Sequence, residues 1–227
     1  MAQVSVWGAF DYANPPPWSV FLASGNAVFL NISDSAKSQT FYGALSYTGT
    51  TSNPQVHGTV TGIDMAVNSM LVYQMSGLNL DAARLQQLVV TPGGGPQFYA
   101  YVLAGDDRFT GTGGGNVLGY AGNDTMGGAT QGGRFDGGTG IDTYEAYLGA
   151  AITADLGAGR LVVVGDPLAR VTQLVSVENL VGSDQGDTLA GSAGDNRLDG
   201  GRGIDTVSYA SAGAAVQVDL GAGTGRG

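Results

Sequence analysis

The sequence contains a nine-residue stretch, Gly137–Glu145, that restricts how the surrounding chain folds. It fits the pattern G-G-x-G-x-D-x-U-x, in which U is a large apolar residue. Glycine allows the positive φ angles of a tight turn, and turn carbonyls together with the Asp carboxylate offer the hard oxygen ligands that calcium prefers. The last three residues predict a short strand whose apolar side chain points inward. One copy is weak evidence, so the interpretation depends on whether the nine-residue phase recurs.

The phase recurs in two blocks, residues 105–145 and 178–208. The apolar position is occupied by Phe109, Leu118, Met126, Phe135 and Tyr144 in the first block, and by Leu180, Leu189, Leu198 and Val207 in the second. All the steps within each block are of nine residues except one, which is of eight. Because the 36 residues from Tyr144 to Leu180 equal four repeats, we expect one stack in register from about Gly105 onward.

These repeats resemble those of the RTX (repeats-in-toxin) family of secreted bacterial proteins, over roughly residues 104–227. The resemblance implies an RTX solenoid, a calcium-binding parallel β-roll in which turns alternate between two sides and each ion is shared by turns about 18 residues apart. The fold class expected is all-β, with a β-rich N-terminal domain containing one helix, residues 1–103, followed by the β-roll, residues 104–227. The family also implies type I secretion to an extracellular or cell-surface location.

The candidate metal ligands stand at position 6 of the repeat. The residues there are Asp107, Asn116, Asp124, Gly133 and Asp142 in the first block, and Glu178, Asp187, Asn196 and Asp205 in the second. One side of the first block is therefore expected to bind two calcium ions, shared by Asp107 with Asp124 and by Asp124 with Asp142. The other side, with Asn and Gly, is degraded.

The second block offers a third candidate calcium site between Asp187 and Asp205, although Gln185 stands where the family pattern has glycine. The pair Glu178 and Asn196 is a weaker candidate. In the alternative interpretation, glycine turns alone stack the solenoid and the Asp residues only cap backbone N–H groups. Stacked carboxylates favour the calcium interpretation, since like charges without a cation would destabilise the stack.

Glycine and negative charge are concentrated in the repeats. Residues 105–227 hold 30 of the 40 glycines and a net charge of −8, out of −10 for the whole chain. Such a region repels nucleic acid and anionic membranes, so we expect no nucleic-acid partner. Neither a signal peptide nor an apolar membrane helix is visible, so we expect no membrane insertion. The absence of cysteine excludes disulfides, thiolate metal sites and a Cys nucleophile.

Residues 1–103 are predicted to form a separate β-rich domain. The candidate strands are Ala2–Trp7, Val20–Leu22, Ala27–Asn31, Thr40–Tyr47, His57–Thr61 and Met65–Tyr73. A helix follows at Leu78–Val90, with Asn79 as its N-cap, and then a strand at Gln97–Ala104. Between the repeat blocks, residues 146–177 are expected to add further rungs, with a longer excursion at Gly157–Ala169.

The sequence favours a non-enzymatic role. His57 is the only histidine, and the motifs H-E-x-x-H, G-x-S-x-G and the P-loop are absent. We therefore expect a calcium-dependent structural or adhesive protein, such as an S-layer, matrix or filament subunit. The alternative is a calcium-triggered folding and export module of a longer secreted enzyme. A third possibility is a haemophore-like module, because Phe41–Leu45 and Ser76–Leu80 resemble stretches of haemophores, with Tyr42 or Tyr47 and His57 as haem ligands.

A longer repeat of about 63 residues relates Gly137–Thr143 to Gly200–Thr206. The chain stops partway through the second copy, so we expect the natural protein to continue. The open end of a solenoid is a template for another strand. We therefore expect self-association, in which C-terminal rungs contact the N-terminal domain of a neighbour through Ala2–Asp11, besides cell-surface or matrix partners.

Overall fold

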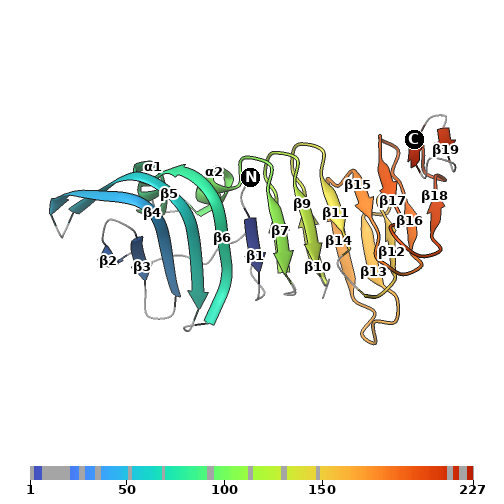
Figure 1. Cartoon of the computed structure of the whole chain (residues 1–227), viewed down its shortest axis with the longest axis horizontal. Coiled ribbons are helices and arrows are strands. Elements are labelled where there is room, and N and C mark those ends of the chain that lie inside the picture. Colours follow the sequence, from blue (N-terminus) through green and yellow to red (C-terminus); the bar gives the residue numbers. More distant parts are fainter. Residues whose placement is uncertain are drawn as a thin grey trace.

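The computed structural model describes residues 3–6, 21–25, 29–33, 37–50, 53–67, 70–90, 95–111, 115–128, 132–146, 149–213, 217–219 and 224–226. These residues form a mostly β structure with two helices, α1 and α2, and two mixed sheets of 13 and 7 strands. The chain is elongated, and its strands succeed one another along the long axis from the N-terminal to the C-terminal part (Figure 1). The expected β class is confirmed, with one helix more than predicted.

Long antiparallel strands build the N-terminal part of the 13-stranded sheet. They are β2 (Phe21–Gly25), β3 (Phe29–Ser33), β4 (Lys37–Thr50), β5 (Asn53–Val67) and β6 (Met70–Asp81), paired in chain order. Along the described side chains of β4, β5 and β6, buried residues alternate with more exposed ones, with Phe41, Ile63 and Met75 inside. The single strand predicted at Met65–Tyr73 is wrong, because β5 ends at Val67 and β6 begins at Met70.

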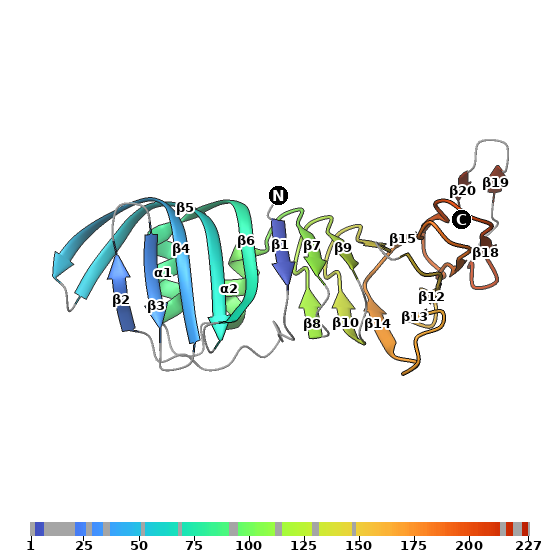
Figure 2. The ribbon, with the colours of Figure 1, turned by 60° about the horizontal axis from the view of Figure 1, so that its bottom comes forward.

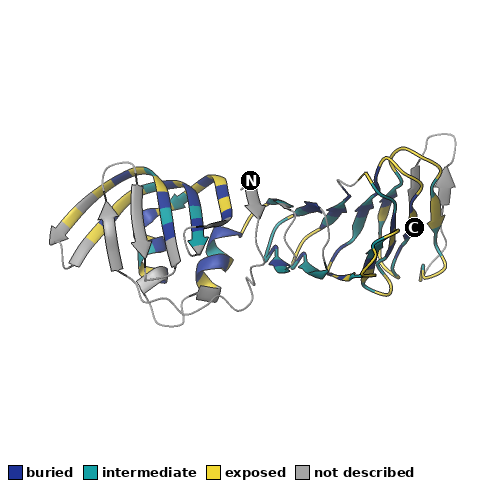
Figure 3. Ribbon diagram, turned by 90° about the horizontal axis from the view of Figure 1, so that it is seen from below, coloured by how far each residue is buried: buried dark blue, intermediate teal, exposed yellow. Residues whose placement is uncertain are grey.

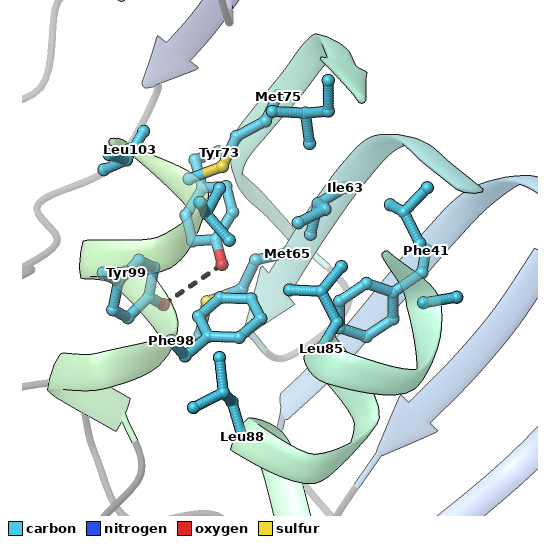
Figure 4. Packing of buried hydrophobic residues seen from close by; sticks show 14 of the residues in the cluster. Phe41, Ile63, Met65, Tyr73, Met75, Leu85, Leu88, Phe98, Tyr99 and Leu103 are labelled. Carbon is cyan, nitrogen blue, oxygen red and sulfur yellow. Dashed lines mark hydrogen bonds between the residues drawn. The ribbon is translucent and has the colours of Figure 1, made fainter. Parts of the chain in front are cut away.

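Two helices, α1 (Ala82–Val90) and α2 (Gly95–Val102), pack on one face of this sheet (Figure 2). The core between them contains Phe41, Ile63, Met65, Tyr73, Met75, Leu85, Leu88, Phe98, Tyr99 and Leu103 (Figure 4). The buried hydroxyls of Tyr73 and Tyr99 lie 3.1 Å apart, and the amide of Gln39 donates to Tyr73 at 2.6 Å.

The predicted helix Leu78–Val90 ends at Val90 as expected, but its N-terminal boundary differs from the prediction. The first helix starts at Ala82, since the backbone N–H of Arg84 donates to Oδ1 of Asp81 at 2.7 Å and makes Asp81, not Asn79, the N-cap. The strand predicted at Gln97–Ala104 is wrong, because Gly95–Val102 is helical. Its buried residues, Phe98, Tyr99, Val102 and Leu103, follow helical spacing, and this run of apolar residues was mistaken for a strand.

Strand β1 (Gln3–Val6) joins the N-terminal strands to the repeat region. It pairs antiparallel with β6 and parallel with β7 (Arg108–Gly111), so the large sheet runs continuously from one part to the other (Figure 1). Both edges of β1 are used within its own chain. Gln3–Val6 therefore has no open edge at which a strand of a neighbouring molecule could pair. A packing contact of Ala2–Asp11 with a neighbour stays a prediction, and the other residues of that segment lie outside the described ones.

Within each repeat block, a strand pairs in parallel with the strand about 18 residues, or two turns, away. In the large sheet β7, β9 (Thr125–Gly128), β11 (Thr143–Glu145), β15 (Asn179–Val181) and β17 (Arg197–Asp199) run parallel. The smaller sheet has parallel pairs between β8 (Gly115–Leu118), β10 (Gly133–Asp136) and β14 (Val171–Val175), and between β12 (Ile152–Asp155), β16 (Thr188–Ala190) and β18 (Thr206–Ser208). Most of these strands have a buried residue beside less buried neighbours (Figure 3).

Two details of the predicted phase are corrected. Phe135 pairs with Val117 rather than Leu118, and Gly133 pairs with Gly115 rather than Asn116. Val117 is the buried residue of this strand, so the eight-residue step comes before β8 and not after it. Position 6 of the two turns on this side is therefore Gly115 and Gly133, neither of which has a side chain that binds metal.

Residues 146–177 add strands to one sheet only. In the large sheet Tyr144 of β11 lies directly beside Leu180 of β15, so no further rung separates the two repeat blocks there. In the smaller sheet β12, β13 (Arg160–Val163) and β14 form an antiparallel meander between β10 and β16. The excursion expected at Gly157–Ala169 contains β13 as a strand of the sheet. The expected additional rungs are thus replaced by a one-sided insertion.

The last described strands are β19 (Gln217–Asp219) and β20 (Thr224–Arg226), which pair antiparallel, with β20 next to β17. Apolar side chains form two clusters. One runs from Phe41 to Met126 and so crosses from the N-terminal strands into the first repeats; the other runs from Tyr144 to Leu198. Among the described residues, neither helix has the length and apolar character needed to cross a membrane.

Candidate metal centre

Carboxylates from turns on one side of the repeat region form a hydrogen-bonded series, the first ladder, made of Asp107, Asp124, Asp142 and Glu178. The backbone N–H of Asp107 donates to Oδ1 of Asp124 at 2.8 Å, and that of Asp124 donates to Oδ1 of Asp142 at 2.7 Å. The N–H of Asp142 donates to Oε2 of Glu178 at 2.8 Å. The structure therefore brings together both Asp pairs predicted on this side and adds Glu178.

A second, shorter ladder lies on the other side, where Asp187 and Asp205 come together as predicted. The N–H of Asp187 donates to Oδ1 of Asp205 at 2.9 Å, and the N–H of Ile152 donates to Oδ1 of Asp187 at 2.6 Å. Ile152 thus takes the place that an Asp would have in the preceding turn. The second ladder ends there because the side chain of Ile152 has no oxygen that could accept a hydrogen bond.

A glycine five residues before each of four Asp residues makes room for the carboxylate. The glycines are Gly119, Gly137, Gly182 and Gly200, and a β-carbon on any of them would overlap Oδ2 of Asp124, Asp142, Asp187 or Asp205, respectively. At Gly119 the same space is bounded by the carbonyl oxygen of Gly137, and at Gly182 by that of Gly200. Carboxylate and carbonyl oxygens of two turns therefore converge where glycine has no side chain.

The outer oxygens of Asp124 and Asp142 lack hydrogen-bond donors. Each residue is 1% exposed, and its Oδ2 is buried without a hydrogen-bond partner. Burial raises the pKa of Asp124 to about 7, opposed by the N–H of Asp107 and assisted by the charges of Asp142 and Asp107. Burial also raises the pKa of Asp142, with a smaller contribution from Glu178. A carboxylate in this state needs a proton or a cation.

The first ladder fits a hard cation. Its unsatisfied oxygens belong to carboxylates and face backbone carbonyls, a donor set that suits calcium and repels anions. Among the described residues, no group of three or more His, Cys, Asp or Glu side chains converges on one point. Carbonyl oxygens would therefore supply much of the coordination, which is common for calcium.

The site at Asp187 is less in need of a cation. Its Oδ2 accepts hydrogen bonds from the backbone N–H of Ser183 at 2.6 Å and from the Ser183 hydroxyl at 3.1 Å. The repeat pattern identified Gln185 as the unusual residue of this turn, but Ser183 is the residue that donates hydrogen bonds to the Asp187 carboxylate. Only the identity of Ser at position 2, where Gly138 and Gly201 stand in other turns, could have signalled this difference.

Asn196, at position 6 of the turn before β17, closes the first ladder with amide hydrogen bonds. Its Oδ1 accepts from the N–H of Ser192 at 2.7 Å, and its Nδ2 donates to the carbonyl of Glu178 at 2.9 Å. Both ends of the amide are used, so it links two turns without a metal. This arrangement agrees with the low weight that the sequence gave to Asn196 as a ligand.

The candidate haem ligands have other partners. The hydroxyl of Tyr42 donates to Oδ2 of Asp64 at 2.9 Å, and its pKa is raised, first by burial and then by Asp64. His57 forms a hydrogen bond with the Thr48 hydroxyl at 2.8 Å. A raised pKa disfavours the phenolate that would bind iron. The side chain of Tyr47 lies outside the described residues.

No protein-family profile matches the chain, and no curated protein is significantly similar to it.

Proposed function

We propose that residues 105–208 form a calcium-stabilised parallel β-roll of the RTX type, and that the protein has a non-enzymatic structural or adhesive role outside the cell. The nine-residue phase, the parallel pairing of strands about two turns apart and the two carboxylate ladders support the β-roll. The cellular location rests on the resemblance of the repeats alone.

The observation that carries the calcium proposal is the pair of buried Oδ2 atoms on Asp124 and Asp142. If the Asp residues only capped backbone N–H groups, Oδ1 would suffice, because it already accepts the N–H of the preceding turn. The second oxygen would then be a buried charge without compensation, which costs several kcal/mol in real proteins. A shared calcium ion removes this cost and binds turns two steps apart to each other.

A structural role agrees with the form of the molecule. The large sheet continues through β1 into the repeats, so stiffening the turns would stiffen the whole elongated chain. Self-association or contacts with cell-surface and matrix components would then use a rigid rod whose order depends on calcium. Among the described residues, β18 lies at the edge of the smaller sheet and offers backbone groups for such contacts.

The proposal is tested by thermal unfolding in EDTA, in millimolar calcium and in the same concentration of magnesium. We expect calcium to raise the melting temperature by several degrees, on the scale of about 2–4 °C per kcal/mol for a chain of this size. Magnesium should act weakly, because it retains its water shell. Equal melting curves and circular dichroism spectra in EDTA and calcium would refute the proposal.

A further inference from the structure

We propose that the chain contains an additional cation site at the junction of the two repeat blocks, between the turn Gly137–Asp142 and the segment Ser176–Glu178. It rests on the proposed calcium function of the ladders, since it extends the first ladder by one step. The segment contains no G-G-x-G-x-D pattern. Three independent contacts nevertheless make it the equivalent of a complete repeat turn.

The first contact is a backbone hydrogen bond that places Ser176. In regular turns the N–H of the first glycine donates to the residue just before the next turn on the same side, as Gly119 does to Asp136 at 2.8 Å. Gly137 donates in the same way to Val175, at 3.0 Å. Ser176, the next residue, therefore occupies the place of the first glycine of a turn.

The second contact is a carbonyl oxygen that faces the buried carboxylate. The space at Gly119 is bounded by Oδ2 of Asp124 and the carbonyl of Gly137, and the space at Gly137 is bounded by Oδ2 of Asp142 and the carbonyl of Ser176. Ser176 has φ of 48°, a conformation that residues with a β-carbon rarely adopt. This strained backbone directs the carbonyl toward Asp142.

The third contact is the carboxylate of Glu178. Its Oε2 accepts the N–H of Asp142 at 2.8 Å, as Oδ1 of Asp142 accepts the N–H of Asp124 at 2.7 Å. Only one residue separates Ser176 from Glu178, whereas four separate Gly137 from Asp142. The Glu178 side chain is one methylene group longer than that of Asp. The extra length lets its carboxylate reach the N–H of Asp142 although the segment is shorter than a regular turn.

The ligand expected here is a hard divalent cation such as calcium. The unpartnered Oδ2 of Asp142, 1% exposed, is directed into this space together with the Ser176 carbonyl, and the Glu178 carboxylate provides a second negative charge. Oδ2 has no hydrogen-bond donor. Because the Asp142 and Glu178 carboxylates are both negatively charged, they would repel an anion from this space. The cation would connect the two repeat blocks at the point where residues 146–177 separate them in the sequence.

The test is calcium counting by native mass spectrometry of the full chain, comparing wild type with Glu178→Gln. The Gln carbonyl keeps an acceptor for the N–H of Asp142 but removes the charge. We expect one calcium ion fewer per chain and an unchanged melting temperature in EDTA. The control is Asp195→Asn, which removes the same charge from an exposed side chain of another turn and should leave the count unchanged.

If Glu178→Gln retains the wild-type number of ions with unchanged affinity, the inference is wrong while the proposed function stands. If wild type itself binds no calcium, the proposed function fails and this site fails with it. Should Glu178→Gln not fold, Glu178→Asp serves instead, because it keeps the charge but shortens the reach. Its last binding step should weaken at least tenfold, and an unchanged titration would overturn the site.

Discussion

The backbone N–H of Asp124 donates a 2.7 Å hydrogen bond to Oδ1 of Asp142, which lies 18 residues further along the chain. One carboxylate oxygen thus fixes the register between two turns, and the other is left buried and unpaired. The two oxygens have separable roles, because the first satisfies the backbone and the second is available to a cation.

Replacement of Asp124 by Asn should have opposite effects with and without calcium. Asn keeps Oδ1 as the acceptor for the N–H of Asp107, and its Nδ2 would face the carbonyl of Gly137, to which an amide can donate. In EDTA the variant should be as stable as wild type or more so, since a buried charge is removed. In calcium it should be less stable than wild type. Melting curves in both buffers check this, and a loss of equal size in both would contradict the separation of roles.

Gly119→Ala should destabilise the protein by about 1–3 kcal/mol, the usual cost of overpacking. The added methyl group would overlap Oδ2 of Asp124 and the carbonyl of Gly137. The matched control is Gly105→Ala, because nothing lies within 4 Å of a β-carbon at Gly105. Urea unfolding of both variants measures the difference. Similar free energies of unfolding for the two would show that the space at Gly119 is not confined.

The pH dependence of stability should change sign with calcium. Without calcium, the pKa of Asp124 in the folded protein is about 7, well above the value of about 4 in an unfolded chain. The folded protein then binds the proton more tightly, so its stability falls as the pH rises from about 4 to 7. With calcium, the proton competes with the ion, and stability should rise over the same range. Melting temperatures at pH 5 and pH 8, in EDTA and in calcium, test both signs.

Strand β1 should couple the N-terminal strands to the repeats. Ser5 lies between Gln74 of β6 and Thr110 of β7, so Ser5→Pro removes a donor from the middle of the sheet. Proline there should cost about 3 kcal/mol and separate the unfolding into two transitions, whereas Ser5→Ala should leave one. A calorimetric scan distinguishes these outcomes. A single transition for Ser5→Pro at the wild-type temperature would mean that β1 carries no coupling.

The sequence predicted the elements whose pattern is periodic. The nine-residue phase located the Asp pairs of both ladders, because repeated turns must stack in register. It assigned the apolar position of β8 to Leu118 instead of Val117. An eight-residue step can lie before or after a strand, and only the strand pairing decides which. It assigned Gln97–Ala104 to a strand because a short apolar run is ambiguous between a strand and a buried helix.

The sequence pattern placed Glu178 at position 6 and paired it with Asn196, but it did not predict the contact of Glu178 with Asp142. The part of this glutamate in the first ladder depends on the Ser176 backbone conformation and on the direct pairing of Tyr144 with Leu180, and neither follows from local sequence. Strand β1 is a similar case, since its partner residues in β6 lie 67–73 residues away in the chain and those in β7 lie 105 residues away. Contacts of this kind depend on tertiary packing, and no repeated sequence pattern predicts them.

The most direct test of the central claim is calcium binding itself. Wild-type protein freed of metal is titrated with calcium in a calorimeter at pH 7.5, alongside a variant carrying Asp124→Asn and Asp142→Asn together. The account predicts saturable binding of more than one ion per chain by wild type, with release of protons from the ladder, and a loss of those ions in the double variant. No saturable binding to wild type, or an unchanged number of ions in the double variant, would contradict it.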